Sequence, residues 1–195
     1  MKKIDKEKLM ASIVSSIANP FIVIIFTLVL GNLELIKKNF EQAVIFLIIN
    51  ATLPFLFYVY ELISHKENWY HFASISQRKR YLIYLSAIFS SLVSTILFSY
   101  THQNTVWVYN SMMLAVLFSI FYMLNRYIDK LSFHAGAFAL SMIYLTDKVS
   151  VFFAVFLAFL PIICWARIKL HKLTWFQLML GSVIGMFIGI LSWTF

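Results

Sequence analysis

Long apolar runs separated by short polar segments make up almost the whole sequence. Five runs of twenty or more residues carry at most one charged side chain each. Because the hydrocarbon core of a bilayer is about 30 Å thick and an α-helix rises about 1.5 Å per residue, each run is long enough to cross a membrane as a helix. The five runs are residues 11–31, 42–63, 81–100, 105–124 and 175–195.

Two shorter apolar runs lie between the fourth and the last of these. Residues 149–165 are near the lower limit for a span and contain Pro161, and residues 131–145 would reach only ~22 Å as a helix. We expect both runs to cross, the second with one end recessed below the membrane surface. The pattern therefore predicts an all-α, polytopic membrane helical bundle of six to seven transmembrane helices, most simply about seven, in a single integral membrane domain over residues 1–195.

Composition excludes a soluble domain. Hydrophobic residues make up 62% of the chain and charged residues only 12%, where a soluble domain holds about a quarter charged residues. The net charge of +8 comes from short basic clusters between apolar runs, with no soluble domain that would form a nucleic-acid groove, so we expect no nucleic-acid partner. The single cysteine, Cys164, lies in an apolar run, which gives neither a disulfide framework nor metal-type spacing.

The basic residues are distributed unequally between the two sides that seven spans would define. Thirteen of the sixteen Lys and Arg residues fall on the side of the N-terminus, and only Lys37, Lys38 and Lys148 fall on the other. By the positive-inside rule this predicts a cytoplasmic N-terminus and an external C-terminus. We expect the membrane to be the plasma membrane of a bacterium.

Prolines and asparagines occur together in the first two runs. Pro20 and Pro54 each remove a backbone donor inside a helix and should kink it. Asn19 and Asn50 lie nearby, and we expect their side chains to bond the carbonyls that the prolines leave without a partner.

Glycine recurs at every fourth residue in the last run, at Gly181, Gly185 and Gly189. This spacing gives a flat stripe on one helix face that allows another helix to approach closely. We favour packing within the chain, and the alternative interpretation is a homo-oligomer interface.

A cluster of polar side chains stands at the start of the short run 131–145. Lys130, Ser132 and His134 precede the small residues Ala135 and Gly136. The N-terminus of a helix directs backbone N–H groups and its positive dipole end outward, which favours an anion. This segment resembles the second signature of the type-2 phosphatidic acid phosphatase (PAP2) family, with Ser132 and His134 at the family's Ser and His positions.

A second segment, residues 166–177, resembles the third PAP2 signature. Arg167 matches its Arg, and Thr174 and Gln177 match the last positions of a variant that ends His-Thr-x-x-Gln. The resemblance implies that Arg167 and Lys130 bind phosphate with Ser132, and that His134 is the general acid. The position of the family's nucleophilic His is Leu173.

His171 is the candidate substitute for that nucleophile, because it lies two residues before Leu173. Residues two apart face the same way in an extended segment, so His171 would then take its place. In a helix the two side chains differ by about 200°, and the substitution fails.

The first PAP2 signature is absent. The loop before residue 81 carries Arg78 and Arg80 instead, whose guanidinium groups suit bidentate contacts to phosphate. The alternative is that they only set the membrane topology. The resemblance covers about residues 76–195.

The resemblance implies a membrane-embedded lipid phosphate phosphatase, acting on phosphatidic acid or an isoprenoid phosphate through a phosphohistidine, without a metal or a soluble cofactor. Leu173 keeps a second interpretation open, a degenerate member that binds lipid phosphates without turnover. A small transporter or scaffold is the third. In each case the expected partners are membrane lipids, and in the first two they are lipid phosphates.

Overall fold

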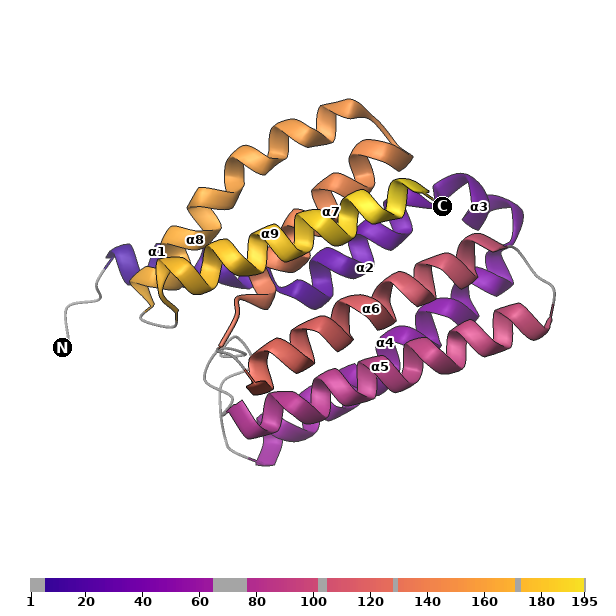
Figure 1. Cartoon of the computed structure of the whole chain (residues 1–195), viewed down its shortest axis with the longest axis horizontal. Helices are drawn as coiled ribbons and strands as arrows, with labels where there is room; N and C mark the ends of the chain where they lie inside the picture. The colour runs from indigo at the N-terminus through magenta and orange to yellow at the C-terminus, as the bar shows by residue number, and fades with distance from the viewer. Residues whose placement is uncertain (1–5, 65–76, 102–104, 128–129, 171–172, 195) are drawn as a thin grey trace. The chain divides into compact units, whose positions relative to one another are not determined.

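The computed structural model describes residues 6–64, 77–101, 105–127, 130–170 and 173–194, and these are helical almost throughout (Figure 1). No strand occurs in these ranges. The chain divides into two compact units, each described here by itself. Unit 1 comprises Met1–Gly31 and Lys130–Thr194, and unit 2 comprises Asn32–Asp129. The single integral membrane domain and the 76–195 core stay predictions.

Unit 1 is built on a close pair of parallel helices. A third helical segment follows the first helix in the chain and runs back in the opposite direction to the start of the second. In Figure 1 this pair is labelled α7 and α9, and α2 also packs against α7. The elements of unit 1 are α1 (Lys6–Ile17), α2 (Pro20–Gly31), α7 (Phe133–Lys148), the 3-10 helix η1 (Val151–Phe159), α8 (Leu160–Lys169), α9 (Trp175–Leu191) and the 3-10 turn η2 (Ser192–Thr194).

The expected kink at Pro20 is a break between two helices. α1 and α2 are bent by 41° at this point. The prediction that the Asn19 side chain bonds a freed carbonyl is wrong. Its Oδ1 instead accepts the N–H of Phe21 at 3.0 Å. Asn19 and Pro20 thus take the places of an N-cap residue and the first helical residue, where the missing N–H of proline costs nothing.

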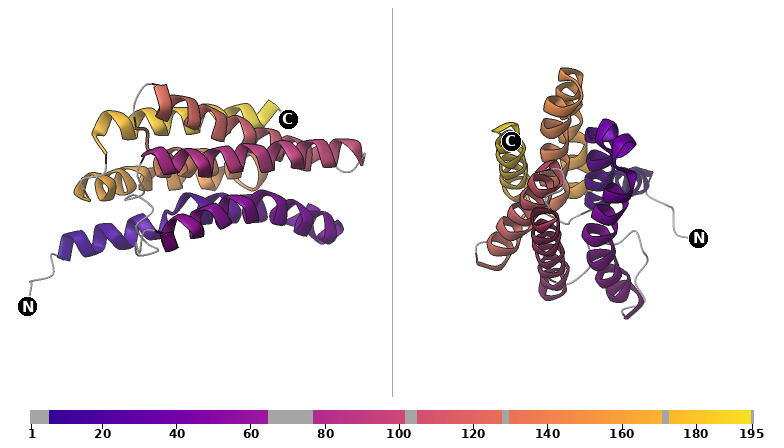
Figure 2. Two further views of the ribbon diagram at one scale, coloured as in Figure 1. Left: turned by 90° about the horizontal axis from the view of Figure 1, so that it is seen from below. Right: turned by 90° about the vertical axis from the view of Figure 1, so that its right-hand side faces the viewer.

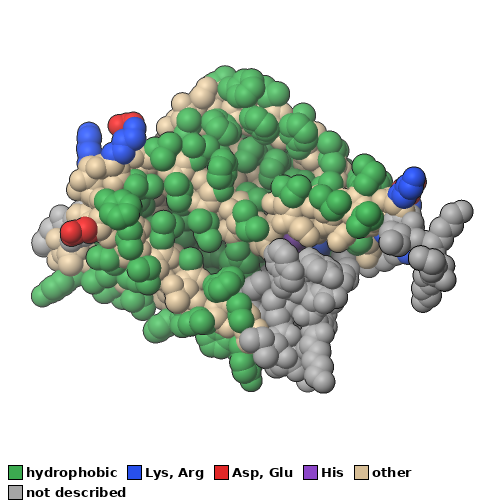
Figure 3. Space-filling model, turned by 180° about the vertical axis from the view of Figure 1, so that it is seen from behind, with side chains coloured by type: hydrophobic (Ala, Val, Ile, Leu, Met, Phe, Trp, Pro, Cys, Tyr) green, Lys and Arg blue, Asp and Glu red, His purple; other side chains and the backbone are tan. Residues whose placement is uncertain are grey.

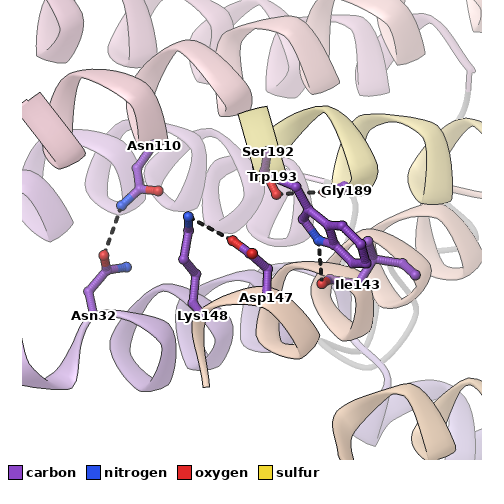
Figure 4. Close-up of polar contacts among 8 residues, drawn as sticks. All are labelled: Asn32, Asn110, Ile143, Asp147, Lys148, Gly189, Ser192 and Trp193. Carbon is purple, nitrogen blue, oxygen red and sulfur yellow. Dashed lines mark hydrogen bonds and ion pairs between the residues drawn. The ribbon is translucent and has the colours of Figure 1, made fainter. Parts of the chain in front are cut away.

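The glycine stripe of α9 lies against α7. A Cβ on Gly181 would come within 2.6 Å of the Ser132 carbonyl oxygen, and one on Gly185 would overlap the carbonyl of Gly136. Only hydrogen at these positions permits the two backbones to approach so closely. At the far end of the pair, the Trp193 indole N–H donates to the Ile143 carbonyl at 3.2 Å (Figure 4). The stripe therefore serves packing within the chain, as favoured from the sequence.

The segment between α7 and α9 combines two kinds of helix. η1 is a nine-residue 3-10 helix that runs into the ten residues of α8. A 3-10 helix rises about 2.0 Å per residue, so η1 and α8 together reach about 33 Å, enough to cross a bilayer. Pro161 lies at the start of α8, where the 3-10 helix η1 passes into the α-helix, and not in the interior of α8.

Unit 2 contains three long antiparallel helices, seen from two further sides in Figure 2. α5 contacts both α4 and α6. The short α3 precedes them, with Asn110 donating to Asn32 at 3.3 Å near its start (Figure 4). The elements are α3 (Leu33–Lys38), α4 (Phe40–Ser64), α5 (Gln77–Tyr100) and α6 (Thr105–Tyr127).

Polar side chains link the three long helices. Asn50 and Ser111 both donate to the Ser94 hydroxyl, at 3.0 Å and 2.8 Å. α4 continues through Pro54. The Asn50 amide donates to the Phe46 carbonyl at 3.0 Å, so the prediction that Asn50 bonds the carbonyl left free by Pro54 is wrong.

Four helical stretches among the described residues are long and apolar enough to cross a membrane, and α1 with α2 makes a fifth if the bent pair is one span. α7 and α9 are shorter, with 16 and 17 residues. The all-α prediction is confirmed, and the count of about seven spans stays a prediction. The four stretches are Phe40–Phe57, Tyr81–Tyr100, Thr105–Tyr127 and Val151–Lys169.

Hydrophobic side chains cover most of the described surface on the face drawn in Figure 3, and charged side chains lie at its margins. Large apolar residues such as Ile96 and Phe187 are exposed on the long helices. Such a surface suits hydrocarbon better than water. It supports a membrane-embedded protein.

Replacing Gly185 by Leu should destabilise unit 1 by about 3 kcal/mol or more. The new side chain would overlap the backbone of Gly136, which cannot move aside as a side chain can, and overpacking normally costs about 1–3 kcal/mol. The midpoint of thermal unfolding in detergent measures the loss. Val183→Leu is the matched control, since Val183 is 60% exposed on the same helix. Equal midpoints for the two variants would show that the α7–α9 contact is not tight.

Candidate functional site

Ser132 fixes the start of α7. It is the N-cap residue, and its side chain accepts the N–H of Ala135 at 3.2 Å. Its own N–H donates to the carbonyl of Gln177, in the first turn of α9, at 3.2 Å. The two segments that carry the PAP2 resemblance, which lie far apart in the chain, therefore meet at one hydrogen bond.

His134 follows in the first turn of α7 and is buried, with 4% of its surface exposed. Lys130, two residues before the N-cap, is partly buried. The structure therefore groups the three residues predicted from this motif around one helix start, where backbone N–H groups favour an anion.

Arg167 lies in the last turn of α8 and is only 3% exposed. Its Nη1 donates to the hydroxyl of Ser15, on α1, at 2.9 Å. A second cation of the same turn, Lys169, forms an ion pair with Glu7, also on α1. α1 thus engages both basic residues at this end of α8.

Thr174 and Gln177 form a capping box at the start of α9. The Thr174 N–H donates to the Gln177 side chain at 3.0 Å, and the Gln177 N–H donates to the Thr174 hydroxyl at 3.4 Å. This reciprocal pair satisfies two backbone donors of the helix end. The variant signature at these positions therefore has a structural explanation in this chain.

Leu173 belongs to an apolar cluster. It packs, with Leu160 and Ile168, against the buried residues Ala135, Cys164 and Leu178. The position that would hold the nucleophile is thus next to the first turn of α7, beside the residue that follows His134, and its side chain contributes to packing.

Three other predicted site residues, His171, Arg78 and Arg80, have side chains that the structure does not describe. His171 lies outside the described residues. Arg78 and Arg80 stand in the first turn of α5, in unit 2, and their side-chain contacts are outside the described part of the structure. The geometry above therefore concerns Lys130, Ser132, His134 and Arg167.

Ser15 and Glu7 are contacts of the site that the sequence reasoning missed. A signal for Ser15 was present, because the buried small residues Ala11, Ser15 and Ala18 recur at helical spacing on one face of the first run. Small residues at such spacing mark a face that packs closely against another helix. Nothing in the spacing identifies α8 as that helix.

Within the described residues, no group of three or more His, Cys, Asp or Glu side chains is placed to hold a metal ion. Comparison of the chain with family models, curated proteins and solved structures finds no match.

Replacing Ser15 by Ala should destabilise unit 1 by about 1.5–3 kcal/mol, because a hydrogen bond to a charged, buried group is worth roughly that much. The neighbouring Ser16 is the matched control: its hydroxyl bonds the Ser12 carbonyl of its own helix, at 2.9 Å. Denaturant unfolding of both variants in detergent measures the difference. A loss no larger than that of Ser16→Ala would mean that Ser15 does not anchor Arg167.

Proposed function

We propose that this chain is an integral membrane protein that binds a lipid phosphate where α7 begins and α8 ends. The observation that carries the proposal is the hydrogen bond from Ser132 to Gln177, because it joins the two segments that resemble PAP2 signatures. A phosphate site assembled from both segments needs them side by side.

The chemistry of these residues suits a phosphate monoester. Arg167 offers a planar set of donors that matches phosphate oxygens, and Lys130 adds a second positive charge. The N-terminus of α7 adds backbone N–H groups and a favourable dipole. A lipid phosphate would enter with its chains in the bilayer and its headgroup at the recessed start of α7.

The proposal includes seven spans, with α1–α2 as one bent span and with α7 and α9 as short spans. It puts the N-terminus, the phosphate site and the start of α5, which carries Arg78 and Arg80, on the cytoplasmic side, on the evidence of the basic residues. The C-terminus is then external.

Binding without turnover is the form of this function that the geometry supports best, because Leu173 is part of an apolar cluster and supplies no nucleophile. Hydrolysis of the lipid phosphate is the second candidate. It is favoured by His134, the residue proposed as general acid, which is buried in the first turn of α7. His171 would then be the nucleophile.

Single cysteines at positions 74 and 104 should label from opposite sides of the membrane. In the proposed topology the loop of Ser74 is cytoplasmic and that of Asn104 is external. The background is a chain in which Cys164, the only native cysteine, is replaced by Ser. Membrane-impermeant maleimide on intact and opened cells is the measurement, and labelling from one side would refute the proposed topology.

Arg167→Ala and Lys130→Ala should each weaken binding of phosphatidic acid roughly tenfold or more, since each charge-assisted contact to phosphate is worth about 1.5–3 kcal/mol. Lys37→Ala is the matched control, because Lys37 is exposed and pairs with Glu34. Nanodiscs containing phosphatidic acid or phosphatidylglycerol provide the assay. Equal effects of all three variants would show that the protein attracts anionic lipid only through its overall charge.

Leu173→His should introduce phosphate release if the wild-type protein is inactive, because it restores a nucleophile next to α7. If the wild-type protein is active, His171→Ala and His134→Ala should each abolish release while lipid binding persists. Release from a panel of lipid phosphates, with vanadate as inhibitor, separates the two cases. If neither the wild-type protein nor Leu173→His binds or hydrolyses any lipid phosphate, the proposed function is rejected.

A further inference from the structure

Unit 2 contains a layer of polar side chains inside its three long helices. Each helix contributes residues of one face, spaced by three or four positions. Ser94 is entirely buried and accepts hydrogen bonds from Asn50 of α4 and Ser111 of α6. The contributing faces are Gln42, Phe46 and Asn50 on α4, Ser91, Ser94 and Phe98 on α5, and Trp107 and Ser111 on α6.

Aromatic rings pack beside this polar layer. The ring centroid of Phe46 lies 4.8 Å from that of Trp107 and 6.2 Å from that of Phe98. Each of these rings is one helical turn from a member of the polar layer, on the side toward residue 101. The rings therefore lie between the Ser94 network and the end of the bundle at residue 101, and Gln42 lies one turn beyond Phe46 on α4.

Several polar atoms of the layer have no hydrogen-bond partner among the described residues. These are the indole N–H of Trp107, the hydroxyl of Ser91 and the amide oxygens of Asn50 and Gln42. Trp107 and Ser91 are each 1% exposed. A buried serine can instead bond a carbonyl of its own helix. The neighbouring Ser90 does so, because its hydroxyl donates to the Ala87 carbonyl at 3.0 Å.

Leaving such groups unbonded in an apolar environment is costly, and inside a membrane no lipid atom of the hydrocarbon core can bond them. The four atoms comprise a donor, two acceptors and a hydroxyl that is both a donor and an acceptor, and none is charged. Water is the small molecule that complements this set, because a buried water makes two to four hydrogen bonds and both donates and accepts.

We propose that the polar layer of unit 2 is a binding site for ordered water, held by Trp107, Ser91 and Asn50 beside the Ser94 network. The aromatic rings separate this water from the end of the bundle at residue 101. The site belongs to unit 2 and is independent of the phosphate site proposed for unit 1.

X-ray hydroxyl-radical footprinting of the full chain in nanodiscs tests the site, because bound water is converted to radicals that oxidise adjacent side chains. Phe46 and Phe98 should be oxidised at least about fivefold faster than Phe121. The comparison is matched, since all three are phenylalanines and are 0%, 1% and 0% exposed. Equal slow oxidation of the three rings would overturn the proposal.

Variants of the proposed ligands sharpen the result. Asn50→Leu with Ser91→Ala should reduce the Phe98 rate to that of Phe121, whereas Ser90→Ala should leave it unchanged. A variant that loses its fold is recognised by faster oxidation of Phe121. In that case the single variant Ser91→Ala is used, and an unchanged Phe98 rate in it would contradict the proposal. If the Phe98 rate rises when choline replaces Na⁺ in the buffer, a cation occupies the layer and the water assignment is wrong.

Discussion

The backbone contact between α7 and α9 is the constraint on which the arrangement of unit 1 depends. In a bilayer, helices gain little from the hydrophobic effect and associate through close packing and hydrogen bonds. Gly181 and Gly185 allow α9 to lie on the backbone of Ser132 and Gly136, and this proximity permits the Ser132 N–H to reach the Gln177 carbonyl. The start of α7 is thereby fixed against the start of α9.

The same contact determines where the charges of unit 1 lie. Because α7 and α9 are parallel, the segment between them must return along the unit, and its last turn ends near their starts. That turn carries Arg167 and Lys169, which α1 engages through Ser15 and Glu7. A buried guanidinium needs hydrogen-bond acceptors such as the Ser15 hydroxyl around it, since burying a charge without them is costly. α1 is therefore both a packing element and part of the environment in which any anion would be bound.

Much of this architecture could be predicted from the sequence, because apolar length reports directly on membrane helices. Residues 81–100 and 105–124 correspond closely to α5 and α6, and the glycine stripe indicated a close helix contact. The 3-10 form of η1, the partner of Ser15 and the cross-helix bond of Asn50 could not be predicted. Each depends on which helix lies opposite, and a period along one helix carries no information about its neighbour. For the candidate site, the sequence identified the residues around Ser132, but it did not show that Thr174 and Gln177 form a capping box.

The position of Leu173 shows why the candidate chemistry and the packing of unit 1 are in competition. A partly buried leucine in the cluster of Ala135, Cys164 and Leu178 contributes up to about 1.5–3 kcal/mol by removing apolar surface from contact with water. An imidazole at the same place would lose part of that contribution and would need hydrogen-bond partners that an apolar cluster does not supply. A nucleophilic histidine at this position is therefore compatible with the fold only if a bound anion or the start of α7 compensates for its polarity. The leucine needs no such compensation, and this is the physical reason why its packing favours the proposed binding without turnover over hydrolysis.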